Sequence, residues 1–287
     1  MKQKKINSKT ANILKNSTIL ITGGAGSFGA ALTEELVKYP VKAIRILDID
    51  EHALFKLKHK INDKRIKFLL CTILDSERID MAGQNVDIII HLAAIKNIEI
   101  SEFNPIEAID TNINGLTNLI KMAIKNKPKI FLNISTDKAV HPSTLYGSTK
   151  LLAERLTSWA GFHLSETKFG TVRFGNLMES RGNVFEIWED ESKNKKPLSI
   201  TDKSMKRYFL HIDEASKFLL SCLPLINLGE IIVPKMKSYK ITDLANKISK
   251  NHKIIGIREG EKLNEDLISD SEKDKSLEKD DYWIIKN

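Results

Sequence analysis

A glycine-rich turn between an apolar strand and a helix constrains this chain more than any other feature of its sequence. Gly23, Gly26 and Gly29 follow the β-rich run TILIT and precede ALTEELVK, in which Leu32 and Leu36 fall on one helical face. Glycines in that context let the chain turn tightly, let backbone N–H groups approach a pyrophosphate, and let the helix pack close to the sheet. The helix N-terminus then faces the phosphate charge. The pattern predicts a dinucleotide-binding unit, the alternative being a glycine turn without a ligand.

Short apolar runs alternate with helical patterns through the first half of the chain, which is typical of parallel βαβ units. The sequence therefore predicts an α/β fold with a Rossmann-type doubly wound parallel sheet. We expect a dinucleotide-binding domain at residues 1–175, with 205–235 returning to it, and a smaller substrate-binding region at 176–204 and 236–287, which includes a final helix from Thr242. The apolar YWII after the charged tail indicates that the end docks back. The predicted strands cover residues 18–22, 43–47, 66–70, 86–90, 129–134 and 169–174, and the longest crossover helix covers 105–124.

Composition excludes several classes of protein. The net charge is +8 over 287 residues, but the lysines are spread along the chain rather than gathered with aromatic residues, so we expect no nucleic-acid partner. The one dense cluster, Lys2 with Lys4 and Lys5, is interpreted as a solvated arm. No apolar run reaches the roughly 20 residues of a membrane helix. Cys71 and Cys222 form no metal-ligand pattern, so we expect no metal and reduced thiols in the cytoplasm.

Asp48 is the candidate for the adenosine ribose. It ends the second predicted strand 19 residues after Gly29, close to the spacing expected of a carboxylate that binds the ribose hydroxyls. A carboxylate there repels a 2′-phosphate, and the following Ile49 offers that phosphate nothing. We therefore expect NAD rather than NADP. Asp50 and Glu51 could substitute, in which case Asp48 is a turn residue.

The segment NISTDKAVHPSTLYGSTK carries the strongest sign of catalysis. Tyr146 and Lys150 are four residues apart and so share one face of a helix, where an ammonium beside a phenol favours the phenolate and lowers the pKa of the tyrosine. Such a phenolate is a usable base, which a free tyrosine is not at neutral pH. Thr136 ends the fifth predicted strand, at the edge where open parallel sheets bind ligands.

With these motifs in view, the chain resembles the short, soluble, inverting UDP-N-acetylglucosamine 4,6-dehydratases, in the polysaccharide-biosynthesis branch of the extended short-chain dehydrogenase/reductase family. Membrane-bound relatives carry methionine at the position of Tyr146. The chain departs from the family pattern at Thr72, Glu186, Glu259 and Asn264, several of which border the expected sugar-nucleotide pocket. The resemblance runs from TGGAGSFG through HLAAIK, EFNPIEAIDTNING, STDKAVHPSTLYGSTK, VRFGN, SRGNV, SITDKSMKRYF and EIIVPKM to GIREGEKLNE.

The resemblance implies a mechanism in which oxidation at C4 of the sugar comes first, because the C5 proton is not acidic until C4 is a ketone. Tyr146 takes the C4 hydroxyl proton, Lys150 keeps the tyrosine ionised and touches the nicotinamide ribose, and Thr136 bonds the C4 oxygen. Lys138 is then the base at C5 and Asp137 the acid that protonates the departing C6 hydroxyl. Hydride returns to C6, with possible inversion at C5. Taken as residues alone, Asp137 and Lys138 have the alternative of a solvated ion pair.

The resemblance also implies which residues bind the cofactor and the substrate. Lys96 is placed near the sugar, its alternative being an exposed loop lysine, and Asn112 is expected to be structural, bridging helix to strand backbone through a water. The predicted cofactor-binding residues are Gly23, Gly26, Ser27, Phe28, Gly29, Asp48, Ala93, Tyr146 and Lys150, and the predicted substrate-binding residues are Lys96, Asn176, Arg181, Arg207, Arg258 and Glu261.

Two other functions are compatible with the sequence. A nucleotide-sugar C4 epimerase shares the fold, the NAD and the tyrosine–lysine pair, but it has no leaving group to protonate, so Asp137 and Lys138 favour the dehydratase. A catalytically silent NAD-binding scaffold is disfavoured by the intact Tyr146 and Lys150. Homo-oligomers are common in this family, and we expect at least a dimer.

Overall fold

Alternate residues of the central strands enter two different hydrophobic cores. In β1 (Thr18–Thr22), Ile19 and Ile21 pack into one core and Leu20 into the other, and all three are fully buried. A strand that is apolar on both faces needs helices on both sides. The computed structural model describes residues 7–286, so the basic cluster at Lys2, Lys4 and Lys5 lies outside the described residues.

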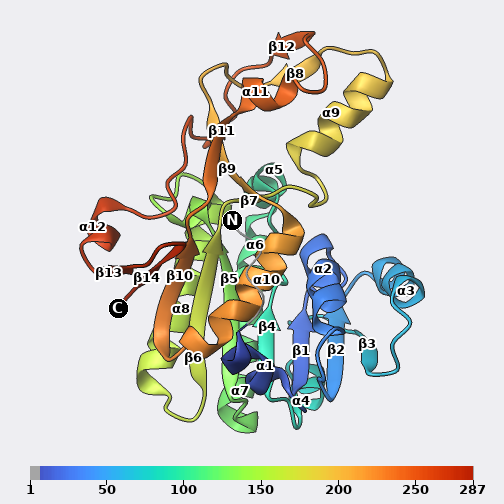
Figure 1. The fold of residues 1–287 in the computed structure, drawn as a ribbon, viewed down its shortest axis with the longest axis vertical. Coiled ribbons are helices and arrows are strands. Elements are labelled where there is room, and N and C mark those ends of the chain that lie inside the picture. The colour runs from blue at the N-terminus through green and yellow to red at the C-terminus, as the bar shows by residue number, and fades with distance from the viewer. Residues whose placement is uncertain (1–6, 287) are drawn as a thin grey trace.

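Within residues 7–286, the large sheet has nine strands and is mostly parallel, with antiparallel pairing only at one edge. From that edge across, the order is β13 (Ser276–Glu278), β14 (Tyr282–Ile285), β10 (Leu228–Pro234), β6 (Lys168–Phe174), β5 (Ile130–Thr136), β4 (Ile88–His91), β1, β2 (Ala43–Asp48) and β3 (Ile66–Leu70). The stretch from β3 to β6 has the order of a doubly wound sheet, which confirms the predicted fold class (Figure 1).

Helices cover both faces of this sheet. The core that contains Ile19 and Ile21 is closed by α1 (Ser8–Leu14), α2 (Ser27–Leu36), α3 (Glu51–Lys60) and α10 (Ile212–Cys222), with η3 (Leu223–Leu225). The core that contains Leu20 is closed by α4 (Ser76–Gly83), α7 (Gly115–Asn126) and α8 (Leu145–His163). Outside α8 lie α5 (Ile98–Phe103) and α6 (Pro105–Ile109), and a π-helical turn η1 (Asp110–Asn114) joins α6 to α7. No helix within residues 7–286 is long and apolar enough to cross a lipid bilayer.

A small lobe stands beyond the carboxyl end of β6, at the top of Figure 1. Its core is built around Trp188, Ile200 and Phe209. It contains β7 (Asn176–Leu177), α9 (Val184–Lys193), β8 (Leu198–Ile200), β9 (Lys206–Leu210), β11 (Lys237–Lys240), α11 (Ile241–Ala245) and β12 (His252–Ile254), arranged around two short sheets, β11-β9-β7 and β12-β8.

Two details of the predicted division differ from the structure. Residues 206–210, expected in the dinucleotide-binding domain, form β9 of the small lobe because they pair with β7 and β11. Residues 276–285, expected in the substrate-binding region, form β13 and β14 of the large sheet, where the apolar YWII run pairs with β10. The expected helix from Thr242 is α11, which ends at Ala245.

A buried ion cluster ties the C-terminal part of the chain to the large sheet. Arg173 of β6 is fully buried and donates from Nε and Nη2 to both carboxylate oxygens of Glu154 in α8, at 2.9 and 2.8 Å. It also donates to Glu272 in α12 (Asp270–Lys273), at 2.7 and 3.0 Å, and to the Leu267 carbonyl. Removal of one partner from such a cluster leaves a buried charge poorly compensated.

We expect Glu154→Leu to lower the free energy of unfolding by about 3–5 kcal/mol, because it removes the bidentate partner of the buried Arg173 guanidinium. Urea denaturation of the variant and the parent measures the difference. The control is Glu166→Gln, which breaks an exposed ion pair with Lys127 and should change stability by less than about 1 kcal/mol. Equal losses in the two variants would contradict the role given to the cluster.

Candidate active site

The glycine turn is held against the neighbouring strand with no room for a side chain. Gly23 has a φ of +64°, and a Cβ placed on it would lie 2.6 Å from the backbone nitrogen of Ala93, which follows β4. A Cβ on Gly29 would lie 2.5 Å from Gly24 Cα. Gly26 is the N-cap of α2, whose first residue is Ser27. The turn therefore presents backbone and a helix N-terminus at the point where the strand order reverses, which suits the pyrophosphate of a dinucleotide.

Asp48 organises the same turn. One oxygen of its carboxylate accepts from the Ala25 N–H at 2.9 Å and the other from the Asp50 N–H at 3.1 Å. Ile49 beside it is 72% exposed and carries no donor for a phosphate. Phe28, by contrast, packs edge-on against Phe174, with ring centroids 5.7 Å apart, and so contributes to the core beneath the turn.

The catalytic candidates gather at the carboxyl end of β5 and the start of α8. Thr136 ends β5, and Asp137 and Lys138 open a one-turn helix, η2 (Asp137–Ala139). The Thr136 hydroxyl donates to Asp137 Oδ1 at 3.0 Å, and Lys138 Nζ donates to the same oxygen at 2.9 Å. Asp137 is fully buried and Lys138 is 17% exposed. Burial strengthens this pair, which is not the solvated loop pair of the alternative interpretation.

Tyr146 lies in the first turn of α8, whose N-cap is Thr144. Burial raises the pKa of Tyr146 to about 12, although the Lys138 ammonium and a hydrogen bond with Thr136 act in the opposite direction. Lys138, rather than the expected Lys150, is the cation whose charge favours the Tyr146 phenolate in this structure. Desolvation of the phenol outweighs that attraction.

Lys150 lies one turn further along α8 and is buried. Burial lowers its pKa to about 8, although Glu154 opposes this shift. The neighbouring His91 at the end of β4 is also buried, its Nδ1 lies 2.7 Å from the Thr22 hydroxyl, and burial lowers its pKa to about 3. His91 is therefore neutral, and the charge in this part of the site is carried by Lys150.

Lys96, Arg181 and Ser27 come together over the glycine turn. Lys96 Nζ donates to the Arg181 carbonyl at 2.9 Å, and the Arg181 N–H donates to Ser27 Oγ at 3.0 Å. The Arg181 guanidinium lies 3.8 Å from Asp50. These contacts carry the segment after β7 across the predicted cofactor site. Asn112, in the π-helical turn, bonds directly to the backbone N–H and carbonyl of Ile95 and to Thr149, which gives it the expected structural role without an intervening water.

The other predicted substrate-binding residues are not all open to a ligand. Arg207 is buried and donates to the carbonyls of Lys206, Lys262 and Leu263 and to Glu261, so it braces the 261–263 backbone instead of standing ready as a diphosphate clamp. Glu261 is likewise occupied, because its Oε1 accepts from Arg207 Nη2 at 3.2 Å. Asn176 donates to the Tyr208 carbonyl, and the exposed Arg258 pairs with Glu99.

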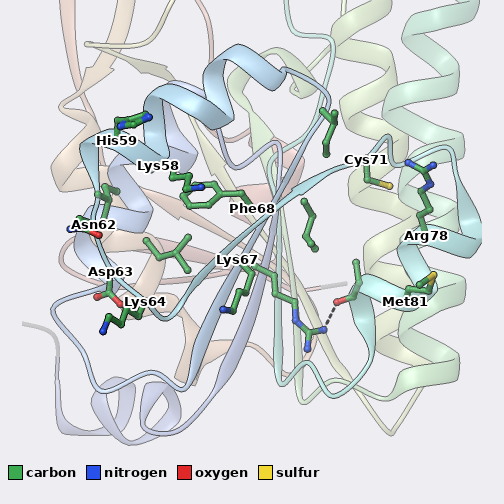
Figure 2. A pocket seen from close by; sticks show the side chains of 16 residues that line it. Lys58, His59, Asn62, Asp63, Lys64, Lys67, Phe68, Cys71, Arg78 and Met81 are labelled. Atoms are coloured by element: carbon green, nitrogen blue, oxygen red, sulfur yellow. Dashed lines mark hydrogen bonds between the residues drawn. The ribbon is translucent and has the colours of Figure 1, made fainter.

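A wide open groove lies elsewhere, at the outer edge of β3 (Figure 2). It has a volume of about 1480 Å³ and runs between Lys58 and His59 of α3 and Arg78 and Met81 of α4, over Phe68. None of the predicted cofactor, substrate or catalytic residues lines it. Within residues 7–286 there is also no group of three or more His, Cys, Asp or Glu side chains arranged to hold a metal ion.

A family model described as polysaccharide biosynthesis protein matches residues 19–287. The chain belongs to this polysaccharide biosynthesis protein family.

Several known proteins match this chain over almost its whole length. A Methanocaldococcus jannaschii protein named as an uncharacterized membrane protein is 39% identical over 96% of this chain and 87% of its own length. An inverting UDP-N-acetylglucosamine 4,6-dehydratase of Campylobacter jejuni is 39% identical over 95% of this chain and 84% of its own. A UDP-glucose 4-epimerase of Rickettsia bellii is 36% identical over 94% and 83%.

Solved structures share the fold. Pen from Bacillus thuringiensis has a TM-score of 0.90 and 32% identity, and the match covers 96% of this chain and 89% of that one. DesIV of Streptomyces venezuelae, a dTDP-glucose 4,6-dehydratase with NAD and TYD bound, has a TM-score of 0.81, 18% identity and coverage of 88% and 89%. At that identity the second match supports the fold alone.

Sequence reasoning missed two charged residues of this family member that lie beside the predicted catalytic pair. Lys262 Nζ donates to the Val140 carbonyl at 2.8 Å and lies 3.6 Å from Glu265 Oε2. Glu265 is buried and interacts electrostatically with both Asp137 and Lys138. Both belong to the motif GEKLNE, which is part of the family resemblance and could have marked them as site residues. The motif alone does not indicate that this segment packs against the loop after β5.

We expect this protein to bind NAD more tightly than NADP, because Asp48 faces the turn that accepts the dinucleotide and Ile49 offers nothing to a 2′-phosphate. Dissociation constants for both cofactors, measured by titration calorimetry, test this. The double substitution Asp48→Ser with Ile49→Arg should reverse the preference, since it replaces an anion by a cation at that position. Tighter NADP binding by the parent protein would contradict the assignment.

Proposed function

We propose that this chain is an NAD-dependent nucleotide-sugar 4,6-dehydratase that acts on UDP-N-acetylglucosamine, a hydro-lyase of surface-polysaccharide sugar biosynthesis. The observation that carries the proposal is the buried Asp137–Lys138 pair next to Tyr146: an acid and a base for elimination stand beside the base for oxidation. The 39% identity to the Campylobacter jejuni inverting 4,6-dehydratase over 95% of the chain supports the same reaction and substrate.

The cofactor site fits a dinucleotide, because the Gly23 turn leaves no space for a Cβ and Gly26 and Ser27 open a helix toward it. NAD, when bound, supplies the acceptance of a hydride from C4 and its return to C6. Ser27, Gly29, Ala93 and Asp48 complete the proposed set of residues that hold it. Lys150, buried and close to the end of β4, is proposed to contact the nicotinamide ribose and to favour the Tyr146 phenolate once the cofactor is in place.

The protein groups then act in a fixed order. Tyr146 takes the proton of the C4 hydroxyl while Thr136 holds the C4 oxygen. The C4 ketone makes the C5 proton acidic, Lys138 removes it, and Asp137 protonates the C6 hydroxyl, which leaves as water. A proton from solvent then adds to C5 on the opposite face, which gives the inverted product. The buried position of Asp137 keeps solvent from competing for the proton that Asp137 gives to the C6 hydroxyl.

We also propose a substrate-binding role for Lys96, Asn176, Arg181 and Arg258. Their side chains come from loops near the glycine turn and from the small lobe, and three of them are cations that suit a nucleotide diphosphate. Arg207 and Glu261 act behind them, as a brace for the backbone of residues 261–263.

The second candidate function is nucleotide-sugar C4 epimerisation. It is favoured by the 36% identity to the Rickettsia bellii UDP-glucose 4-epimerase over 94% of the chain. An epimerase returns hydride to C4 after the ketose rotates, so it needs no acid for a leaving hydroxyl. The buried Asp137–Lys138 pair therefore favours dehydration.

Finally, we infer a homo-oligomer that works in the cytoplasm. Large apolar side chains are exposed on α5, α6 and α8, which pack against one another: Phe103 is 84% exposed, Ile106 70% and Trp159 50%. We infer that these side chains belong to one interaction surface, the exposed apolar patch of α5, α6 and α8. Cys71 and Cys222 are both free and buried, which suits a reducing compartment.

Incubation with NAD and a panel of UDP-, GDP- and dTDP-sugars tests the reaction directly. We expect UDP-N-acetylglucosamine to give a product lighter by one water, and Tyr146→Phe to abolish turnover while leaving the nucleotide sugar bound, since the ring remains and the base is lost. Mass spectrometry follows the product and calorimetry the binding. Unchanged product mass with altered stereochemistry would show an epimerase instead.

We expect Asp137→Asn and Lys138→Ala to perform the first hydride transfer and to stall before water is lost, because each removes a group that acts only after the ketone has formed. Absorbance of bound NADH should accumulate on mixing with substrate. In solvent deuterium, the wild-type product should carry label at C5, and the stalled variants should return unlabelled substrate. Dehydration at the wild-type rate by both variants would remove the pair from the mechanism.

Ile106→Glu together with Trp159→Glu should convert the oligomer into a monomer, because each places a charge in the exposed apolar patch. Light scattering after gel filtration measures the mass. Leu277→Glu, which changes an exposed apolar residue on β13 and not on α5, α6 or α8, is the control and should keep the parent mass. A parent protein that is already monomeric would contradict the inference.

A further inference from the structure

A segment from the end of the chain is clamped against the catalytic loop. Arg207 of β9 donates to the Lys262 and Leu263 carbonyls at 2.7 and 2.8 Å. From the other side, the Ser143 hydroxyl donates to the Gly260 carbonyl at 2.6 Å, and Lys262 Nζ donates to the Val140 carbonyl. These bonds fix the backbone of residues 260–263 between the small lobe and the loop that follows Lys138. Glu265 is carried to the catalytic pair as a result.

Glu265 is enclosed beside Lys138. It is only 7% exposed, and the two side chains line one small void of about 10 Å³, room for about a single water. Within the described chain, neither Glu265 Oε2 nor Asp137 Oδ2 has a hydrogen-bond partner. Burial of Glu265 favours its protonated form, although the Lys262 ammonium, 3.6 Å from Glu265 Oε2, acts in the opposite direction. Glu265 therefore has an oxygen at which a proton can reside.

The elimination step needs a proton arrangement that differs from the resting one. In the structure, Lys138 and Asp137 form an ion pair with 2.9 Å between Nζ and Oδ1. A base at C5 must be the neutral amine, and an acid at the C6 hydroxyl must be the neutral carboxylic acid. Transfer of one proton from Nζ to Oδ1 along the existing hydrogen bond converts the first arrangement into the second.

An ionised Glu265 opposes that transfer. Its electrostatic interaction with Lys138 is larger than that with Asp137. A negative charge on Glu265 therefore stabilises the Lys138 ammonium more than it destabilises the Asp137 carboxylate, and it keeps the proton on Lys138. Consistent with this, Asp137 and Glu265 raise the pKa of Lys138 above its usual value, although burial acts in the opposite direction.

We propose that Glu265 is a positioning residue of the elimination step: in its protonated form it frees the Lys138 amine to act as the base at C5, and in its ionised form it holds Lys138 as an ammonium. This inference rests on the proposed dehydratase function. The protons balance, because the Lys138 amine takes the C5 proton as Asp137 gives its proton to the C6 hydroxyl. The C6–O bond breaks, water leaves, the C5–C6 double bond forms, and the Asp137–Lys138 ion pair is restored. Glu265 keeps its own proton throughout.

The proposal predicts a pH dependence with a definite sign. The charged groups that face Glu265 are Lys138 and Asp137 from η2, Lys262 from its own segment and Arg207 from β9. Burial raises the pKa of Glu265 above its usual value, although the three cations oppose the shift. The protonated form is thus present at low pH and is lost as pH rises through this raised pKa. Elimination should slow on the alkaline side, by about tenfold per pH unit for a single ionisation, whereas oxidation at C4 should not.

The test compares wild type with Glu265→Gln, whose amide imitates the protonated acid at every pH. Single turnovers with NAD and UDP-N-acetylglucosamine are followed over a pH series by NADH absorbance and by product mass. In wild type, we expect NADH to accumulate increasingly as pH rises. In Glu265→Gln, we expect elimination to lose this dependence, and so to exceed the wild-type rate by about tenfold or more at the alkaline end. The exposed control Glu166→Gln should keep the wild-type profile.

Each outcome is decisive. An unchanged alkaline decline in Glu265→Gln, or loss of elimination at every pH in a variant with the wild-type melting temperature, would overturn the proposal. A wild-type protein that never releases a product lighter by one water would instead overturn the dehydratase function itself. If Glu265→Gln does not fold, infrared spectra of wild type decide the matter. A buried protonated carboxyl band that disappears at the pH where NADH begins to accumulate supports the role of Glu265, and its absence over that range contradicts it.

Discussion

Burial of the central strands on both faces is the constraint on which the rest of this structure depends. Ile19 and Ile21 of β1 enter one core and Leu20 the other, so helices must cover both sides. Those helices lie in the connections between strands, and β1 pairs parallel with β2 and β4. Parallel strands all end at the same edge of the sheet. The turn after β1, Ala93 after β4 and the Asp137–Lys138 pair after β5 are therefore brought together, and the chemistry of the site follows from the hydrophobic pattern beneath it.

The apolar pattern was enough to predict the parallel part of the fold. The predicted strand at 18–22 coincides with β1, and that at 66–70 with β3. The pattern does not encode the π-helical turn at Asp110–Asn114, where an interior contact between Asn112 and the Ile95 backbone replaces regular helix. It also did not indicate that β13 would join the large sheet, because Ser276–Glu278 is polar in part and its pairing with β14 depends on a tertiary position that no local signal carries.

In the candidate site, too, some residues could be predicted from the sequence and others could not. Gly23, Asp48, Thr136 and Tyr146 were predictable because each stands at a fixed place relative to a strand or helix end. The pKa of Tyr146 was not, since it depends on how deeply α8 is packed and on Lys138 being near. Glu265 was not predictable either. It lies more than 120 residues after Lys138 in the sequence, and only the bonds from Arg207 and Ser143 to residues 260–263 bring the two together.

The contact between the 260–265 segment and the catalytic loop has a consequence for how the protein is made. A ribosome releases the glycine turn and β5 early, and N-terminal parts of a chain generally fold first. Arg173, buried in β6, must nevertheless wait for Glu272, and the Asp137–Lys138 pair must wait for Glu265. A nascent chain can therefore complete the sheet around the glycine turn well before Glu265 and Glu272 arrive, so the charge environment of Lys138 and of Arg173 is set only late in synthesis.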